Sequence, residues 1–380
     1  MTLEERLAYC RAAARGDRPT KFPIYGNMWT WAIYDSGYRL QDALYDWDIM
    51  FDAWMKFQAK YDLDYYCNPG ARNPFKFTEV LGGNKYTLDR ERDTLQFLDF
   101  HTMEADEYDE FCQDVFKFKY TKALPRKAPG ALTADAETMK RAFSELQQFF
   151  GFKARLSEAM ISQYGAPERS QQEISIPFED LFLFLRGIKG ISVDIRRQYD
   201  KVKEAVNAIN EQGAKGMNMS YYDMNPANDI WVFDTAVCFL GHSILSVKQF
   251  AELYWAPIEP CFKKNEEMGK TCMVFVEADI ARFADFFADY KKGQFAIQYE
   301  NETIDVIKKA FPNCSIMGGI DYETLGSGTP EQNVDMVKRA IDIVGDAGLT
   351  FCPNKMLSYK NDCKSENLKA IVDYLASYKF

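Results

Sequence analysis

Apolar and polar positions follow a regular alternation of strand and helix periods over the second half of the chain. Short apolar, β-branched runs predict strands at 230–239, 271–277, 294–300, 314–320 and 348–352. Between and after them, apolar side chains spaced by three or four residues predict helices at 246–269, 280–291, 302–310, 330–345 and 365–378. This regular half is expected to begin with a helix at 193–212 and a strand at 216–222. Strands that alternate with helices of this length are typical of βαβ units and a parallel sheet. This repetition favours a (β/α)8 barrel, with a doubly wound sheet as the alternative.

The first half has a mixed order of elements and no clear βα period. Helical spacing predicts helices at 3–15, 39–61, 104–121 and 135–165. Strand-like runs occur at 21–29 and 64–74, and residues 76–100 alternate as in a hairpin around Gly82, Gly83 and Asn84. No linker or low-complexity run interrupts the chain. We therefore expect one domain, residues 1–380, that is a barrel with N-terminal elaborations.

Composition narrows the classes of function. The chain is 47% apolar and 15% aromatic, so it can bury a large core, and its net charge of −10 argues against nucleic-acid binding. The N-terminus lacks the apolar segment of a secretory signal, and no apolar run is long enough to suggest a membrane span. The nine cysteines are scattered without a CxxC pair, which is typical of reduced thiols. The expected location is the cytoplasm.

Polar residues follow several predicted strands of the second half. Glu277 and Glu300 close two neighbouring strands, Asp321 follows a third, and Cys352 closes the last. In parallel α/β folds the chemistry lies where strands end and loops begin. Two carboxylates and a thiolate at one barrel rim can bind Zn²⁺ and leave a position open for substrate. The alternative is that both glutamates are solvated loop residues and Cys352 is a small core residue.

His242 follows the predicted strand 230–239 and is one of two histidines in the chain. It is a candidate ligand or general acid, with a purely structural role as the alternative. The other histidine, His101, lies in an acidic stretch and is a weaker candidate. No GxGxxG follows a predicted strand, and no GxxxxGK[ST] occurs, so nucleotide binding has no support in the sequence.

Three segments of the second half resemble one known superfamily. They read HSILSVKQFAELYWAPIEPCFKKNEEMGK, SIMGGIDYETLGSGTPEQNVDMVKRAID and FCPNKMLSYKNDCKSENLKAIVDYL. Together they resemble the uroporphyrinogen decarboxylase superfamily, which includes cobalamin-dependent methyltransferases. The resemblance covers roughly residues 240–380 and is weaker before them. It implies a (β/α)8 barrel, in agreement with the periodicity.

The resemblance also separates two branches of that superfamily. The decarboxylase branch holds its many carboxylates with an arginine-rich N-terminal motif, whereas residues 22–35 contain no arginine. They offer Tyr25, Asn27, Trp29 and Trp31 instead, which we expect to bind substrate together with Asp321.

The methyltransferase branch holds zinc through a His-x-Cys pair and a later cysteine. Here Phe275 and Glu277 stand in place of that pair, and Cys352 matches the later cysteine. The resemblance, with Glu300 as a further carboxylate, implies a zinc set of Glu277, Glu300 and Cys352, with His242 and Glu277 as the catalytic residues. An oxygen-rich set suits an ether or phenolate oxygen better than a thiol.

Three hypotheses about function follow. The first is a zinc-dependent methyltransferase, an O-demethylase component that removes a methyl group from a small, O-methylated aromatic donor. It would pass this group to the cobalamin of a partner corrinoid protein, because the chain shows no Asp-x-His-x-x-Gly corrinoid motif. The second is a cofactor-free, uroporphyrinogen-type decarboxylase. The third is a non-catalytic barrel that has lost its zinc site. A homodimer is left open.

Overall fold

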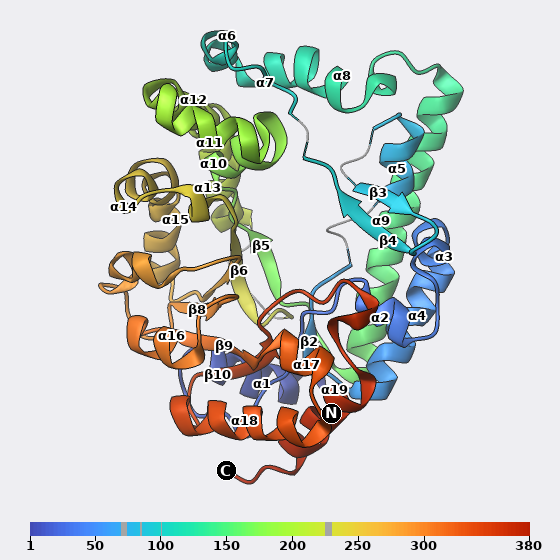
Figure 1. Ribbon diagram of the computed structural model, residues 1–380, viewed down its shortest axis with the longest axis vertical. Helices are drawn as coiled ribbons and strands as arrows, with labels where there is room; N and C mark the ends of the chain where they lie inside the picture. Colours follow the sequence, from blue (N-terminus) through green and yellow to red (C-terminus); the bar gives the residue numbers. More distant parts are fainter. Residues whose placement is uncertain (70–73, 84–85, 100, 225–229) are drawn as a thin grey trace.

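The computed structural model describes residues 1–69, 74–83, 86–99, 101–224 and 230–380 (Figure 1). Its main sheet has six strands, all parallel, in the order β10-β9-β8-β7-β6-β5. The strands are β5 (Ser170–Glu173), β6 (Phe233–Phe239), β7 (Cys272–Val276), β8 (Phe295–Gln298), β9 (Ser315–Ile320) and β10 (Leu349–Pro353). The α/β class and the strands expected at 230–239, 271–277, 294–300, 314–320 and 348–352 are confirmed.

A second parallel sheet joins both edges of the first. It consists of β1 (Tyr25–Gly26) and β2 (Tyr65–Tyr66), which pair in parallel. Just before β1, Ile24 forms a parallel bridge with Phe351 of β10, and Tyr66 of β2 forms one with Glu168, just before β5. Parallel pairing therefore passes from β10 through β1 and β2 to β5. The strand-like run expected at 21–29 becomes this short β1.

Helices of the second half follow one another around the outside of the strands (Figure 1). They include α14 (Val247–Gln249), the π-helical turn η6 (Phe250–Trp255), α15 (Ala256–Glu267), α16 (Ile304–Ala310), α17 (Tyr322–Ser327), α18 (Pro330–Val344) and α19 (Ser365–Ser377). They confirm the helices expected at 246–269, 302–310, 330–345 and 365–378. Residues 280–291 contain a 3-10 helix, η7 (Ala281–Phe287), in place of the expected α-helix.

The first half supplies most of the remaining helices. They include α1 (Leu3–Ala14), α2 (Trp31–Asp35), α3 (Leu40–Tyr45), α4 (Trp47–Tyr61), α5 (Phe75–Val80), α6 (Tyr108–Gln113), α7 (Val115–Phe118), α8 (Leu124–Lys127), α9 (Ala136–Tyr164), α10 (Pro177–Glu179), α11 (Gly187–Arg197) and α12 (Tyr199–Ile209). The single helix expected over 104–121 is broken into α6, α7 and a π-helical turn that begins at Lys119. The 29-residue α9 runs along one side of the molecule toward the elements drawn at the top of Figure 1.

Two sequence predictions, one in each half of the chain, were wrong. Residues 216–222 form helix α13 (Lys215–Met224) and no strand, because Asn218, Tyr221 and Tyr222 are buried at helical spacing. The hairpin is β3 (Tyr86–Asp89) with β4 (Thr94–Phe97), so its turn lies after Asp89 rather than at Gly82 and Gly83. Asp89 accepts hydrogen bonds from the two following turn amides, of Glu91 and Arg92, which is the turn chemistry of aspartate. Asn84 lies outside the described residues.

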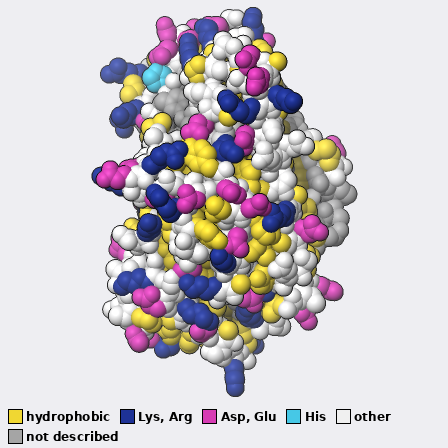
Figure 2. Space-filling model, turned by 90° about the vertical axis from the view of Figure 1, so that its right-hand side faces the viewer, with side chains coloured by type: hydrophobic (Ala, Val, Ile, Leu, Met, Phe, Trp, Pro, Cys, Tyr) yellow, Lys and Arg dark blue, Asp and Glu magenta, His cyan; other side chains and the backbone are white. Residues whose placement is uncertain are grey.

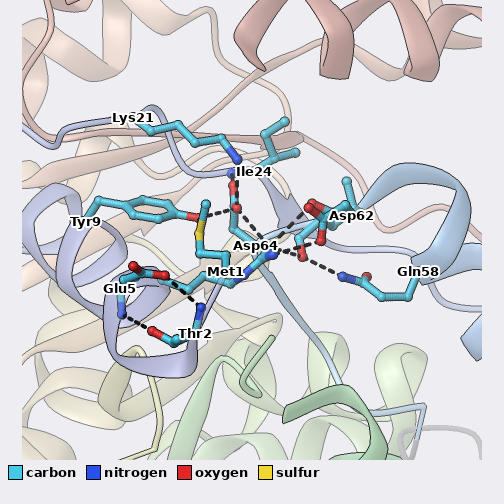
Figure 3. A network of polar contacts seen from close by, with 11 residues as sticks. Met1, Thr2, Glu5, Tyr9, Lys21, Ile24, Gln58, Asp62 and Asp64 are labelled. Atoms are coloured by element: carbon cyan, nitrogen blue, oxygen red, sulfur yellow. Dashed lines mark hydrogen bonds and ion pairs between the residues drawn. The ribbon is translucent and has the colours of Figure 1, made fainter. Parts of the chain in front are cut away.

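Helix α1 covers the amino ends of the strands. Its apolar side chains Leu7, Tyr9, Cys10 and Ala14 pack in one cluster with Phe233, Met273 and Met317 of the sheet. The cluster is anchored by Asp64, which precedes β2 and is fully buried. Asp64 accepts hydrogen bonds from Arg6 at 3.0 Å, Lys21 at 3.1 Å and the Ile24 amide at 2.8 Å, and one from Tyr9 (Figure 3). This network ties α1, β1 and β2 together at the amino end.

The outer surface mixes charges of both signs. On the face shown in Figure 2, lysines and arginines alternate with acidic residues, and apolar side chains lie between them in small groups. No helix in the described part of the chain is long and apolar enough to cross a membrane.

Candidate active site at the carboxyl ends of the strands

The carboxyl ends of the strands are the accessible end of the sheet interior. Side chains alternate along a strand, so every second residue points to the same side. On β7, Met273 and Phe275 belong to the interior cluster with α1, whereas Val274 and Val276 pack against the outer helices. Beyond Phe275 on the interior side comes Glu277, which is exposed. The interior side of β7 is therefore buried beside α1 at the amino end and reaches an exposed residue at the carboxyl end.

Strand register defines the layer of interior side chains near this end. Phe275 of β7 is in register with Cys238 of β6 and with Gln298 of β8, which is in turn in register with Met317 of β9. Gln298 is fully buried and donates to the Pro353 carbonyl at 3.3 Å. Its Oε1 has no hydrogen-bond partner among the described residues. A buried acceptor of this kind is costly unless a water or ligand satisfies it.

The predicted zinc set lies at this end but does not gather around one point. No group of three His, Cys, Asp or Glu side chains in the described part of the chain could hold a metal ion. The Glu300 carboxylate accepts a hydrogen bond from the Ala278 amide at 2.9 Å, so it is used to hold the loop after β7. Glu277 is exposed on the same loop. The set of Glu277, Glu300 and Cys352 therefore does not fit zinc in this structure.

Cys352 has the environment of a core residue. Its side chain is fully buried in the cluster that contains Phe275, Met273 and Met317. Burial raises the pKa of the Cys352 thiol far above its usual range. Phe275, at the position where the resemblance predicts a zinc ligand, adds apolar surface to the same cluster.

His242 lies away from the strand interior. It is fully buried in the outer layer, where its ring packs near Phe239, Tyr254 and Phe283. Its Nε2 is 3.2 Å from the Asp279 carbonyl oxygen. Burial lowers the pKa of His242 to about 4, so the ring is neutral at physiological pH. The geometry indicates a structural role that connects the loops after β6 and β7, and the structure does not bring His242 to Glu300 and Cys352 as a metal site.

The predicted aromatic substrate surface divides into two parts. Tyr25 is fully buried, stacks on Tyr65 with ring centroids 4.9 Å apart, and belongs to the interior cluster. Asn27, two residues on, is 1% exposed, and its Nδ2 donor has no acceptor among the described residues. Trp29 is half-buried, and its amide donates to the Leu357 carbonyl. Trp31 instead packs against α4 and donates to the Cys363 carbonyl at 3.1 Å, which places it in the outer core.

Asp321 and the two glycines before it have clear structural roles. The Asp321 carboxylate caps α17 by accepting from the Thr324 amide and hydroxyl, each at 2.8 Å. A side chain at Gly318 would collide with the Tyr299 ring, and the Tyr299 hydroxyl accepts from the Gly319 amide at 3.2 Å. Asp321 also lines a cavity of about 240 Å³ between α16 and α18, outside the strand interior.

Sequence reasoning missed an arginine in the interior. Arg169 precedes β5, and its side chain is 12% exposed. It forms an ion pair with Glu173, which is in register with the interior residue Ala236, and it lies near Cys67 and Cys238. Its signal in the sequence is weak, because β5 reads as a short polar stretch, SQQE, rather than an apolar run.

A buried carboxyl group was also missed. Glu179 of α10 is 9% exposed and accepts hydrogen bonds from the amides of Leu240 at 2.9 Å and Gly241 at 2.7 Å, and from the Tyr254 hydroxyl. Its other oxygen, Oε2, is buried without a partner in the described structure. Burial raises the pKa of Glu179 to about 7, and the nearby Glu277 charge adds to this shift. Glu179 therefore supports the end of β6 and exchanges a proton near neutral pH.

The loop after β7 holds a strained residue. Ala278 has a φ of 62°, a conformation that residues with a side chain rarely adopt. The hydrogen bond from its amide to Glu300 holds it there. Strain of this kind is often found at functional sites, and here it sits directly beside Glu277.

Comparisons with known proteins support the fold. No protein-family model matches the chain, and no curated protein is significantly similar to it. Among solved structures, the chain is similar to a methyltransferase from Methanosarcina mazei, with a TM-score of 0.61 and 14% sequence identity. The match covers 99% of this chain and 98% of that protein. At this identity the likeness shows a shared fold over the whole length.

Proposed function

We propose that this chain is a methyltransferase built on a single (β/α)8 barrel domain, residues 1–380, with its active site at the carboxyl ends of the strands. The observation that carries the proposal is the full-length similarity to a methyltransferase of solved structure. The parallel bridges from β10 through β1 and β2 to β5 support closure of eight strands into the barrel. The covered amino end leaves the carboxyl end for the substrate, as in other barrels of this type.

The methyl donor that the site fits best is a small aromatic methyl ether. The interior is lined by apolar and aromatic side chains, among them Tyr25, Tyr65 and Phe275, which suit a flat ring. Removal of the methyl group leaves a phenolate oxygen, which needs a hydrogen-bond donor. Asn27 Nδ2 supplies a buried donor with no other acceptor in the described residues. This donor stabilises the developing negative charge where water is excluded.

The methyl acceptor in this proposal is the cobalamin of a partner corrinoid protein, whose reduced cobalt supplies the nucleophile. No step is assigned to zinc, because the residues expected to hold it do not come together. What this chain contributes is binding, orientation and a donor to the leaving oxygen. Glu277, at the rim beside the strained Ala278, faces the entry of the site.

The test is a demethylation assay. The protein is incubated with a panel of methoxybenzenes and cob(I)alamin, with and without added Zn²⁺, and the demethylated phenol and the loss of cob(I)alamin absorbance are measured together. We expect equal amounts of both, and a rate reduced by about 100-fold in Asn27→Ala, as for other single donors to a developing oxyanion. An exposed amide, Gln96, supplies the control variant Gln96→Ala. The proposal is refuted if no phenol forms across the panel under either metal condition.

A further inference from the structure

A pocket lies between α15 and the segment 285–290, on the outer side of the strands. Its volume is about 490 Å³, which is enough for a small molecule. The residues that line it come from η6, α15, η7 and the turn after η7, and none of them belongs to a strand. The pocket is therefore separate from the strand ends where methyl transfer is proposed.

Carboxylates from two elements line this pocket. Glu259 and Glu266 come from α15, where a spacing of seven residues puts them on one face of the helix. Asp285 and Asp289 come from η7 and the turn after it. Lys263 is the only cation among the described lining residues, and it pairs with Glu259 at 3.0 Å. The other three carboxylates have no ion-pair partner in the described part of the chain, so the pocket is negatively charged.

The Tyr290 hydroxyl is a buried polar group at this pocket. The Tyr290 side chain is 8% exposed, and its Oη has no hydrogen-bond partner among the described residues. Burial raises the pKa of Tyr290 far above its usual range, and the charges of Glu259 and Glu266 add to the shift, so both carboxylates lie near the hydroxyl. Glu266 is held there by a hydrogen bond from the Lys291 amide at 3.0 Å. An unpaired buried hydroxyl is costly, and an N–H donor of a ligand can satisfy its oxygen.

Aromatic side chains form the apolar part of the lining. The Trp255 ring contacts the Phe286 ring at a centroid distance of 5.4 Å and the Tyr290 ring at 6.2 Å. Trp255 is itself buried, which fixes the position of its ring. Aromatic rings attract cations to their faces and also pack against methylene groups. The pocket thus combines apolar rings with an excess of negative charge.

A metal ion does not match this charge distribution. No group of three His, Cys, Asp or Glu side chains within the described ranges could hold one. The carboxylates are spread over two walls of the pocket instead of converging on one point. A ligand whose positive charges are separated by an apolar chain matches this spread. An aliphatic diamine has this form, because each of its ammonium groups donates N–H bonds and the methylene groups between them pack on apolar surface.

We propose that this pocket is a binding site for an aliphatic diamine. One ammonium donates to the Tyr290 hydroxyl and pairs with Glu259 and Glu266. The other ammonium pairs with Asp285 or Asp289, and the methylene chain lies against the aromatic rings. This site is distinct from the proposed methyltransferase site, and its occupancy does not depend on methyl transfer.

Calorimetry on the full chain tests the site with 1,4-diaminobutane as the probe. Two further compounds serve as comparisons: butane-1,4-diol has the same chain without charge, and butylamine has one ammonium group. We expect one diamine to bind per chain, at least about tenfold more tightly than butylamine, because the second ammonium adds a charge-assisted contact. The diol should show no binding.

Tyr290→Phe distinguishes a hydroxyl that binds the ligand from one that is only structural. We expect the affinity for the diamine to fall by about three- to tenfold in this variant, the size of one hydrogen bond. Glu266→Gln should lower the affinity by about tenfold through loss of a charged partner. Glu158→Gln, at an exposed position on α9, is the matched control and keeps the wild-type affinity. Urea unfolding shows whether each variant is folded, and Glu266→Gln decides alone if Tyr290→Phe is not.

Four results would overturn the proposal. Three of them are no binding of the diamine, equal affinity for the diamine and the diol, and wild-type affinity in both Tyr290→Phe and Glu266→Gln. The fourth is an equal loss of affinity in Glu158→Gln and Glu266→Gln. It would show that the diamine responds to the overall negative charge of the protein and not to this pocket.

Discussion

The buried carboxyl group of Glu179 makes protein stability depend on pH in a predictable direction. It is 9% exposed, and burial raises its pKa from 4.5 to about 7. In the unfolded chain the group regains an ordinary pKa. The folded state therefore holds the proton more tightly than the unfolded state does. Its contribution to stability is fully present below pH 4.5 and is lost as the pH rises to about 7.

The size of the effect follows from the two pKa values. The pKa of Glu179 is 4.5 in the unfolded chain and about 7 in the folded protein. Each unit of difference between these two pKa values changes the free energy of unfolding by about 1.4 kcal/mol, so the total change with pH is roughly 3 kcal/mol. Most of this change occurs between pH 5 and pH 8. Over that interval the contribution of Glu179 to the free energy of unfolding falls by about 2 to 3 kcal/mol. Glu179→Gln removes the titration. Its amide oxygen can still accept from the Leu240 and Gly241 amides.

Urea unfolding at pH 5, 6, 7 and 8 measures this contribution. The free energy of unfolding of the wild type minus that of Glu179→Gln is expected to fall by about 2 to 3 kcal/mol across the series. The difference isolates Glu179, because other titrating groups are common to both proteins. Glu91→Gln, at an exposed position in the β3–β4 turn, is the control and shows a flat difference. A flat difference for Glu179→Gln as well would refute the raised pKa.

Three further predictions concern stability. Asp64→Asn should lower the free energy of unfolding by about 3 to 5 kcal/mol in urea, because it removes the buried carboxylate that pairs with Arg6 and leaves Arg6 only Asp62, which is 59% exposed; a loss below about 1 kcal/mol would show that the network is not needed. Ala278→Gly should raise the free energy of unfolding by about 0.5 to 1 kcal/mol, since glycine adopts the φ of 62° without strain. A lower free energy of unfolding in this variant would show that Ala278 is not strained. Asp321→Ala should lower the free energy of unfolding by about 1 kcal/mol through loss of the α17 cap and leave the demethylation rate unchanged; a clear fall in that rate would instead return Asp321 to substrate binding.

Local patterns were sufficient for most elements after residue 230. The strands β6 to β10 bury nearly all of their residues, so they read as continuous apolar runs that can be recognised without knowing the fold. Helices α15, α18 and α19 are amphipathic and were found by their spacing. By contrast, β5 is polar, and β1 and β2 have only two residues each. Such strands have no recognisable apolar run, and they form because they pair with strands that are distant in the sequence.

The sequence by itself determined the α/β class, the positions of the strand ends after residue 230, and the aromatic character of the region around Tyr25. Only the tertiary structure decided which side chains meet there. A position at a strand end does not show whether a carboxylate is already hydrogen-bonded to another part of the chain. The Glu300 carboxylate accepts a hydrogen bond from the Ala278 amide. His242 follows a strand, yet it turns outward into an aromatic layer. Arg169 gives only a weak signal in a polar stretch, and it becomes notable only because the fold places it beside Glu173, Cys67 and Cys238. Burial and pairing across the chain produce these outcomes, and neither is encoded in local spacing.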